Sequence, residues 1–314
     1  MSRVGAWIAG VLVGALMAGL AAWALATNAK LFVITALNGL TLGALYFLVA
    51  AGFTLVFGLM RNVNLAHGSL YLLGGYLGFE VGDRTGSWLL ALAAGFVAAA
   101  LVGLLLQTAV FRFMQGEDLR QTLVTIALSI MLADVMLWQW GGQIYQFDPP
   151  RAIFGGTPLP LVDRYPTYRL VVLALAIGLG VLLWAFLNRT RVGMMIRAGV
   201  DDRAMLAAAG VNVHFVFAVT FALGAGLAGL GGVVGGTALS IAPGEDTRYL
   251  LASLMVVIVG GMGSVVGAGL GAALIGLAEQ FGLAYAPTYG IVFMFVVLVG
   301  VLAFRPQGLL GRRA

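Results

Sequence analysis

The sequence predicts an all-α membrane protein, a polytopic helical bundle of about ten transmembrane helices with both termini in the cytoplasm. Of its 314 residues, 61% are hydrophobic and only 9% are charged, and the mean hydropathy is +1.04. A soluble fold of this length could not bury so much apolar surface. Glycine accounts for 46 residues, about twice its usual share, which predicts helices in close backbone contact.

Apolar runs follow one another along the whole chain, and about 20 residues suffice for one crossing of the bilayer. The run at 31–60 is longer than one crossing needs, so we expect a bent or re-entrant span with breaks at Asn38-Gly39 and Gly43. Residues 260–264 (GGMGS) predict a turn between a short helix and the next one, with a single long tilted helix as the alternative. We place the ten spans at 5–27, 31–60, 65–81, 87–110, 122–140, 169–187, 215–239, 250–262, 264–281 and 289–304.

The basic residues indicate which side of the membrane each loop occupies. Ten crossings put both termini on the same side, and a cytoplasmic N-terminus leaves eleven basic residues inside and six outside. Because cytoplasmic segments carry the excess of lysine and arginine, this distribution predicts an N-in, C-in topology. The inside residues are Arg3, Arg61, Arg112, Arg120, Arg189, Arg191, Arg197, Arg203, Arg305, Arg312 and Arg313; the outside residues are Lys30, Arg84, Arg151, Arg164, Arg169 and Arg248.

The first apolar run, 5–27, has two interpretations. It follows a basic residue, Arg3, and ends near Ala24-Leu25-Ala26, as a signal peptide would. The run exceeds the usual signal core, so we expect an uncleaved anchor, an extra N-terminal span, with cleavage as the alternative. We expect residues 1–314 to form a single transmembrane domain.

The long outer loop, 141–168, contains five prolines, at positions 149, 150, 158, 160 and 166. Proline at this density prevents a regular helix. We therefore expect an ordered extracytoplasmic cap.

Residues 188–214 form a hydrophilic interruption with four arginines, expected in the cytoplasm. Within it, Asp201 or Asp202 can cap a short helix, Gly210 suits its C′ position, and Leu206 and Val211 fall where a Schellman stop makes its apolar contact. A capped helix of about two turns indicates a docking element for a partner, with an ordinary arginine-rich loop as the alternative. The residues expected to form this element are Asp201, Asp202, Arg203, Ala204, Met205, Leu206, Ala209 and Gly210.

The motifs of several enzyme classes are missing from the sequence. The single lysine, Lys30, is not part of a P-loop, so this chain is not expected to hydrolyse ATP by that route. Neither His-Glu-x-x-His nor Gly-x-Ser-x-Gly occurs, and an enzyme is not expected. With no cysteine and only two histidines, we expect no metal site and no cofactor on this chain. The arginines are spread among loops, which argues against nucleic-acid binding despite a net charge of +5.

Several polar residues fall at membrane depth. Asn62, Asn64 and His67 lie between two predicted spans, where they can cap broken helix ends or line a polar passage. A plain cytoplasmic turn is the alternative. Asp134 is expected to face the bundle interior because an unpaired charge at that depth is costly, whereas Glu279 can sit at the interface. The candidates for a translocation path or a helix break are Asn38, Asn62, Asn64, His67 and Asp134.

The spacing of glycines predicts where helices approach closely. Gly263, Gly267 and Gly271 recur every four residues, which would leave one helix face without side chains. The span at 215–239 carries seven glycines and is expected to be smooth over much of its surface. Close packing follows from this pattern, and sliding of the helices is the further hypothesis.

Five segments of the chain match the motifs of one transporter family: 38–46 (NGLTLGALY), 64–68 (NLAHG), the loop 193–213, the run 259–268 (VGGMGSVVGA) and the ending 305–311 (RPQGLLG). They resemble the permeases of branched-chain amino-acid ABC importers of the high-affinity Leu/Ile/Val uptake type. The resemblance covers 31–311 in the family's order. The first span is additional to the shorter family members.

The resemblance implies a pore-forming subunit, in a bacterial inner membrane, of an importer for branched-chain or other small amino acids. It implies a second related permease, two cytoplasmic ATPase subunits that hold ATP and Mg, and a periplasmic substrate-binding protein. Segment 201–211 would be the coupling helix seated on an ATPase subunit. Urea, short amides or small organic acids are the alternative substrates within the family. A secondary transporter or channel that works without ATP is the alternative class, although it would usually carry more charges within the membrane.

Overall fold

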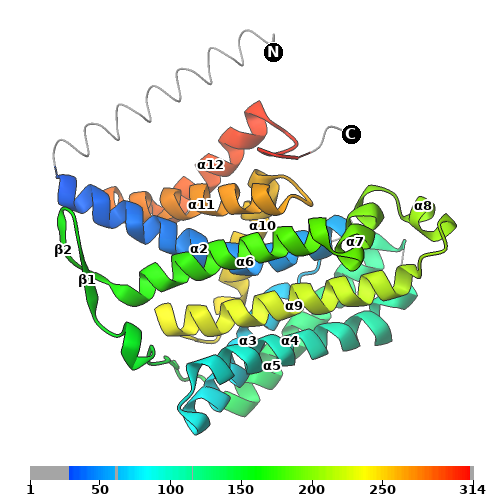
Figure 1. Cartoon of the computed structure of the whole chain (residues 1–314), viewed down its shortest axis with the longest axis horizontal. Helices are drawn as coiled ribbons and strands as arrows, with labels where there is room; N and C mark the ends of the chain where they lie inside the picture. The colour runs from blue at the N-terminus through cyan, green and yellow to red at the C-terminus, as the bar shows by residue number, and fades with distance from the viewer. Residues whose placement is uncertain (1–27, 61–62, 115, 312–314) are drawn as a thin grey trace.

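In the computed structural model, which describes residues 28–60, 63–114 and 116–311, long helices lie side by side (Figure 1). The predicted span 5–27 and Asn62 fall outside the described residues. The helices are α2 (Ala29–Met60), α3 (His67–Thr85), α4 (Trp88–Ala109), α5 (Asp118–Trp140), α6 (Thr167–Arg189), α7 (Arg191–Asp201), α8 (Arg203–Ala208), α9 (Val213–Ala238), α10 (Glu245–Gly260), α11 (Val265–Tyr285) and α12 (Gly290–Phe304). Three 3₁₀ turns are at Phe111–Met114, Arg151–Ile153 and Pro287–Tyr289.

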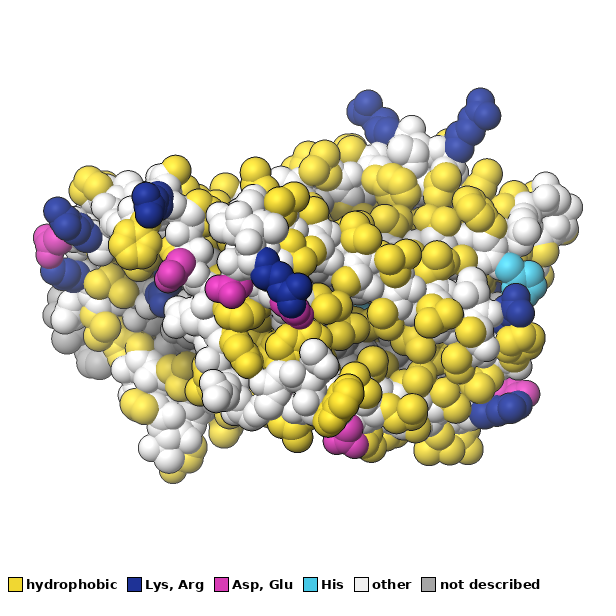
Figure 2. Space-filling model, turned by 90° about the horizontal axis from the view of Figure 1, so that it is seen from below, with side chains coloured by type: hydrophobic (Ala, Val, Ile, Leu, Met, Phe, Trp, Pro, Cys, Tyr) yellow, Lys and Arg dark blue, Asp and Glu magenta, His cyan; other side chains and the backbone are white. Residues whose placement is uncertain are grey.

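The helical content and the apolar helices identify an α-helical, multi-pass membrane protein. Seven helical segments among the described residues are long and apolar enough to cross a membrane: α2, α4, α5, α6, α9, α11 and Pro287–Phe304. Two further predicted spans correspond to α3 and α10, and α10 has only 16 residues. On the face shown in Figure 2, hydrophobic side chains cover most of the surface and charged groups are few. The total of ten spans and the N-in, C-in orientation stay predictions.

One antiparallel hairpin interrupts the helical fold. Strands β1 (Gly156–Leu159) and β2 (Val162–Pro166) lie in the proline-rich loop, where a regular helix was not expected. Lys30 at the start of α2 lies 2.5 Å from Asp163 of β2, and their hydrogen bond holds the pKa of that carboxyl below its usual range. Both side chains are exposed, so the pair adds little stability. We call this end of the bundle the hairpin end, and the opposite end, where α7 and α8 lie, the α8 end (Figure 1).

Helix α2 occupies the centre of the bundle. Its most apolar stretch is 94% buried, and α6, α9, α10 and α11 all pack against it. A helix that is hydrophobic on every side must be enclosed by other helices or by lipid, and here protein encloses it. The remaining helices are therefore arranged around α2.

The expectation that 31–60 breaks at Asn38-Gly39 and Gly43 or re-enters the membrane is wrong, because α2 is one continuous helix of 32 residues. At 1.5 Å per residue it is about 48 Å long, which exceeds the hydrocarbon core and implies tilt. The residues taken as break points make close contacts instead. A Cβ on Gly43 would lie 2.6 Å from the carbonyl oxygen of Ala272 in α11, and one on Gly39 would lie 2.9 Å from Leu277.

Glycines also bring α9 against its neighbours. A Cβ on Gly232 would lie 2.0 Å from the carbonyl oxygen of Tyr71 in α3, and one on Gly229 would lie 2.3 Å from that of Gly95 in α4. Gly224 meets α2 in the same way, with Gly52 opposite it. The absence of side chains lets the backbones touch, which maximises van der Waals contact where lipid removes the hydrophobic driving force.

The segment 250–281 contains the predicted turn. Helix α10 ends at Gly260, and α11 begins after Ser264, whose hydroxyl accepts a hydrogen bond from the Gly267 amide at 3.0 Å. Gly263 belongs to this turn, with φ of +77°, so it is not on the helix face with Gly267 and Gly271. The two helical glycines face α10, where added Cβ atoms would lie 2.2 Å from the Gly260 oxygen and 2.5 Å from the Val256 oxygen.

We expect Gly267→Ala to destabilise the bundle, because the added carbon would strike the backbone of α10, which cannot move without separating the helices. Overpacking of this kind costs about 1–3 kcal/mol. The matched control is Gly178→Ala, since a Cβ on this α6 glycine meets nothing within 4 Å. Thermal unfolding of the purified variants in detergent should show a lower midpoint for Gly267→Ala only. Equal midpoints for the two variants would contradict the close contact.

Candidate functional site

The hydrophilic segment at the α8 end consists of two helices rather than one. Helix α7 was not predicted; Thr190 caps it by accepting a hydrogen bond from the Gly193 amide at 3.0 Å. Its buried residues, Gly193, Ile196 and Gly199, recur every three residues and form the face that packs on α2 and α6. That spacing and the threonine cap were visible in the sequence and could have revealed the helix.

Helix α8 has a defined start and stop. Asp202 is its N-cap, and Oδ1 accepts hydrogen bonds from the amides of Ala204 at 2.8 Å and Met205 at 3.0 Å. Asp201, the other candidate cap, is the last residue of α7. At the other end, the Gly210 amide donates to Ala207 and the Val211 amide donates to Leu206, the two bonds of a Schellman motif. Gly210 has φ of +78°, which suits glycine.

Most of α8 is exposed, and one buried residue, Leu206, attaches it to the bundle. Leu206 is buried and contacts α7 near Gly199. Arg203 places its guanidinium 5.1 Å from the centre of the Phe217 ring in α9. The outward side chains are apolar and mostly small: Met205 is 68% exposed, and Ala204 and Ala209 are exposed as well. The result is a short, rigidly capped helix that projects a methionine and alanines from the bundle.

A polar cavity of about 360 Å³ lies at the hairpin end. Its wall is formed by residues from α2, α6, α10 and α11, from the end of α9 and from the segment that follows α9. They combine two arginines and a glutamate with amides, hydroxyls and leucines: Asn38, Thr41, Leu42, Leu45, Arg169, Ala238, Leu239, Ser240, Glu245, Arg248 and Gln280. The volume falls within the range of about 300–1,000 Å³ that is usual for small-molecule sites.

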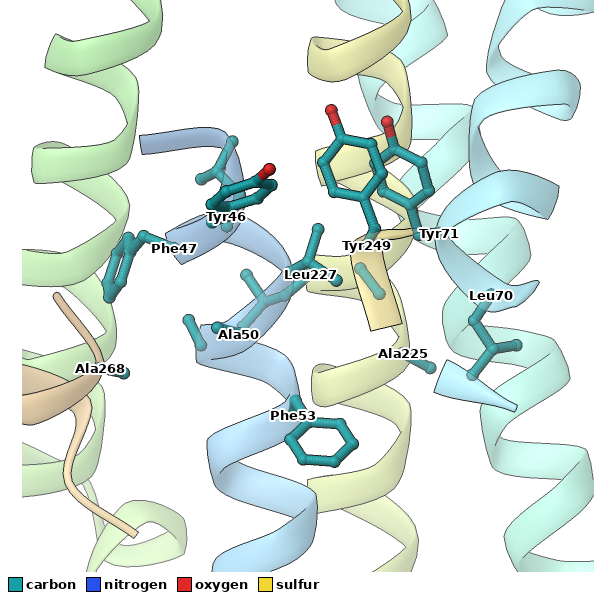
Figure 3. Packing of buried hydrophobic residues seen from close by; sticks show 14 of the residues in the cluster. Tyr46, Phe47, Ala50, Phe53, Leu70, Tyr71, Ala225, Leu227, Tyr249 and Ala268 are labelled. Carbon is teal, nitrogen blue, oxygen red and sulfur yellow. The ribbon is translucent and has the colours of Figure 1, made fainter. Parts of the chain in front are cut away.

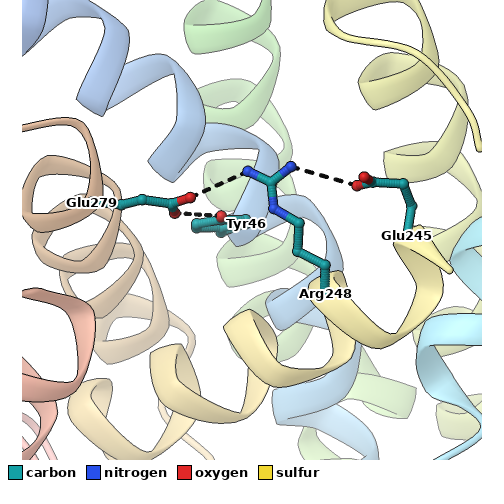
Figure 4. A network of polar contacts seen from close by, with 4 residues as sticks. All are labelled: Tyr46, Glu245, Arg248 and Glu279. Atoms are coloured by element: carbon teal, nitrogen blue, oxygen red, sulfur yellow. Dashed lines mark hydrogen bonds and ion pairs between the residues drawn. The ribbon is translucent and has the colours of Figure 1, made fainter. Parts of the chain in front are cut away.

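Beside this cavity, four residues form an ionic cluster (Figure 4). The Arg248 Nη2 donates to Glu279 at 3.2 Å, while its Nη1 lies 3.6 Å from Glu245. The Tyr46 hydroxyl also donates to Glu279, at 2.5 Å. Glu279 is only 4% exposed, so protein encloses this carboxylate, and its expected place at the membrane interface stays a prediction. Its charge is tolerated because two donors from α2 and α10 satisfy it.

Arg248 is not among the predicted site residues, because the predicted span begins at residue 250. Helix α10 begins five residues earlier, at Glu245, and it places Glu245 and Arg248 one turn apart on the same side. Two acidic residues in the first turn, Glu245 and Asp246, are a usual signal of a helix start and could have extended the prediction.

Asn38 joins α2 to the hairpin and α6. Its Oδ1 accepts hydrogen bonds from the Tyr165 hydroxyl of β2, at 3.1 Å, and from the Arg169 guanidinium. Tyr165 also hydrogen bonds with Thr41, one turn further along α2. Asn38 is therefore placed at the cavity wall and is not a helix break.

A layer of tyrosines lies next to the ionic cluster, inside the bundle (Figure 3). Tyr46 contacts Tyr249 edge to face, with ring centres 5.8 Å apart, and Tyr249 stacks on Tyr71 at 4.0 Å. The hydroxyls of Tyr249 and Tyr71 point away from Phe53, which lies further toward the α8 end along α2. The three rings are buried among the helices at the centre of the bundle.

His67 and Asn64 lie beyond the tyrosines, and both are buried. The His67 Nε2 lies 3.1 Å from the carbonyl oxygen of Val49 in the middle of α2. Asn64 Oδ1 accepts a hydrogen bond from the Ala66 amide. His67 Nδ1 and Asn64 Nδ2 have no hydrogen-bond partner among the described residues. Unpaired polar atoms inside a protein are costly, and a functional site is one reason to retain them.

Asp134 lies on the exposed face of α5, contrary to the expectation that it faces the interior of this bundle. Helix α5 packs mainly against α3 and buries Gln121, Thr125 and Met136. Asp134 is two residues from Met136, about 200° around the helix, and so it points away from α3. The structure therefore does not bring Asp134 together with Asn38, Asn64 or His67.

No group of three or more His, Cys, Asp or Glu side chains that could hold a metal ion occurs among the described residues. The arrangement offers hydrogen-bonding and charged groups, and no nucleophile–base pair is part of it.

Comparison with protein families gives a match over most of the chain. Residues 35–302 match the family described as "Branched-chain amino acid transport system / permease component". No solved structure matches the chain significantly.

Individual relatives agree with this match. The chain is 32% identical over 291 residues to the high-affinity branched-chain amino acid transport system permease protein BraD of Pseudomonas aeruginosa, covering 88% of this chain and 94% of the relative. It is 31% identical over 303 residues to LivH of Escherichia coli K12, named in the same way, with the same coverage. The ribose import permease protein RbsC of Escherichia coli K12 is 28% identical over 244 residues, 74% of this chain and 73% of the relative.

We expect Tyr46→Phe to lower the stability of the bundle by about 1–3 kcal/mol, because Glu279 would lose one of its two donors while remaining buried. Tyr285→Phe is the matched control, since Tyr285 is 40% exposed on the same helix as Glu279. Thermal unfolding in detergent compares the two. The cluster would not be a stabilising element if both variants unfolded at the wild-type temperature.

Proposed function

The chain belongs to the family of permease components of branched-chain amino acid transport systems, and we propose that it moves a branched-chain or other small amino acid as part of an ATP-driven importer of the bacterial inner membrane. Its relatives BraD and LivH are named as permeases for such amino acids. The observation that supports this function best is the family match over residues 35–302. Seven helical segments among the described residues are long and apolar enough to span a membrane, as a permease requires.

In this proposal the α8 end is cytoplasmic and the hairpin end is extracytoplasmic. Four arginines, Arg189, Arg191, Arg197 and Arg203, lie in or beside α7 and α8. This excess of positive charge supports the cytoplasmic placement. The cavity at the hairpin end then faces the side from which a periplasmic binding protein would deliver the substrate.

Helix α8 is the proposed contact with an ATPase subunit. Its N-cap and Schellman stop fix the backbone, and Met205 and the alanines form an exposed apolar surface that a cleft can receive. Two such ATPase subunits would hold ATP and Mg, because this sequence has no P-loop. Leu206 would carry the movement of α8 to α7, against which it packs.

His67 and Asn64 are the proposed residues of the closed part of the translocation path. They lie beyond the tyrosine layer, and their unpaired nitrogens would be satisfied when helix movement admits substrate or water.

A second, related permease is the proposed partner of the α5 face that bears Asp134. A carboxylate in contact with lipid costs at least about 2.5 kcal/mol, which a polar group on a partner would offset. The same face exposes Met131 and Trp138, which are 62% and 84% exposed. A partner that covers this face would bury both side chains.

The function is tested by reconstituting the chain with two ATPases, a second permease and the binding protein in proteoliposomes. We expect ATP-dependent uptake of leucine, isoleucine or valine. Uptake that persists without ATP would instead favour a secondary transporter.

We expect Gly210→Val to weaken co-purification with the ATPase subunit while insertion into the membrane stays normal. A β-branched residue at φ of +78° is strained, so the Schellman stop would distort and α8 would lose its fixed position. Gly210→Asn is the control, because asparagine tolerates this conformation. Wild-type ATPase binding and uptake in Gly210→Val would rule out α8 as the coupling element.

We expect Asp134→Leu to reduce recovery of the second permease with this chain severalfold, because it removes the polar group from the proposed interface. Asp134→Asn keeps the hydrogen-bonding shape and should retain assembly. Thr108→Leu, an exposed polar residue of α4, is the matched control. If Asp134→Leu assembles as well as the control, this face of α5 contacts lipid.

A further inference from the structure

The cavity at the hairpin end has the chemistry of a site for a zwitterion. Arg248, Arg169, Glu245 and Glu279 lie in or beside its wall and carry two formal positive and two formal negative charges. A neutral set of separated charges can receive a ligand that is itself neutral and carries one charge of each sign, without leaving an unpaired charge behind.

The contact between Arg248 and Glu245 is the loose part of this cluster. Its 3.6 Å separation exceeds a usual charged hydrogen bond, whereas Glu279 is held at 3.2 Å and also by Tyr46. Arg248 is 44% exposed and Glu245 is 30% exposed, so both can be reached, while Glu279 is buried. A guanidinium has five donors, and a carboxylate can take two of them side by side.

We infer that a free α-amino acid binds in this cavity by inserting between Arg248 and Glu245. Its carboxylate accepts hydrogen bonds from the Arg248 guanidinium, and its ammonium group pairs with Glu245. The Glu279–Tyr46 contact holds Arg248 in place from behind. This assignment rests on the proposed import function and names the residues by which the permease receives its substrate.

The rest of the wall suits an aliphatic side chain. Leu42 and Leu45 lie one turn apart on α2, while Ala238 is the last residue of α9 and Leu239 follows it. Apolar walls with a few placed polar groups are typical of small-molecule sites. The relative RbsC is named for the import of ribose. A neutral sugar carries no charged groups that could replace the partners of Arg248 and Glu245 in their ion pair.

The absence of cysteine in this chain allows a direct test of binding. Ser240 lines the cavity, and Ser240→Cys can be labelled with a charged thiosulfonate reagent in the assembled transporter without the binding protein. The matched control is Ala152→Cys, at an exposed position of the same end. Labelling is followed on this chain by its change in mass.

We expect L-leucine to slow the labelling of Ser240→Cys severalfold and to leave Ala152→Cys unchanged. 3-Methylbutylamine, which lacks the carboxylate, and 4-methylpentanoate, which lacks the ammonium group, should protect much less, and D-ribose should not protect. Adding Arg248→Gln should abolish protection by leucine, whereas Arg164→Gln, an exposed arginine of β2, should not.

Three outcomes would overturn the inference: no protection by leucine, equal protection by the two analogues, or protection that survives both Arg248→Gln and Glu245→Gln. If Arg248→Gln fails to assemble, the analogue series on Ser240→Cys alone decides. The proposed function is judged separately, by ATP-dependent leucine uptake of the wild-type transporter. Uptake without protection refutes the site alone, and protection without uptake refutes the import function alone.

Discussion

The enclosure of α2 is the constraint on which the rest of this structure depends. A helix without a polar face gains little by lying among other helices rather than lipid unless its backbone comes close to theirs. Gly39, Gly43 and Gly52 provide that approach. Opposite the last two lie small residues, Ala272 of α11 and Gly224 of α9. Because backbones are in contact, any side chain added at these positions would have to push a whole helix.

The ionic cluster is an exception within this apolar packing. Glu279 is buried at the junction of α2, α10 and α11, and Tyr46 and Arg248 satisfy it. Removing one partner of a buried pair is more costly than the pair is stabilising, so the cluster fixes the relative positions of these helices. Glu245, by contrast, is partly exposed, and its contact with Arg248 is longer. The Arg248–Glu279 contact is therefore structural, whereas a ligand can replace the Arg248–Glu245 contact.

Helix α2 connects the two ends of the bundle. At the hairpin end Asn38 and Thr41 contribute to the cavity wall, and at the other end Leu59 contacts Gly199 of α7, which in turn packs against Leu206 of α8. A continuous helix transmits displacement along its axis better than a broken one. Helix α2 therefore links the proposed substrate site to α7, and the side chains of Leu59 and Leu206, both packed at Gly199, continue this link to the proposed ATPase contact, α8.

The sequence by itself determined the class of protein, the family, the turn after Gly260 and the capped α8, because hydropathy, motifs and capping are local properties of the chain. Only the tertiary structure decided that α2 is continuous, that Glu279 is buried and that Asp134 faces outward. Each depends on partners distant in sequence: Tyr46 and Glu279 are 233 residues apart. The ionic cluster and the cavity could not be predicted for the same reason, since no periodicity within α10 specifies which helix will lie opposite Arg248.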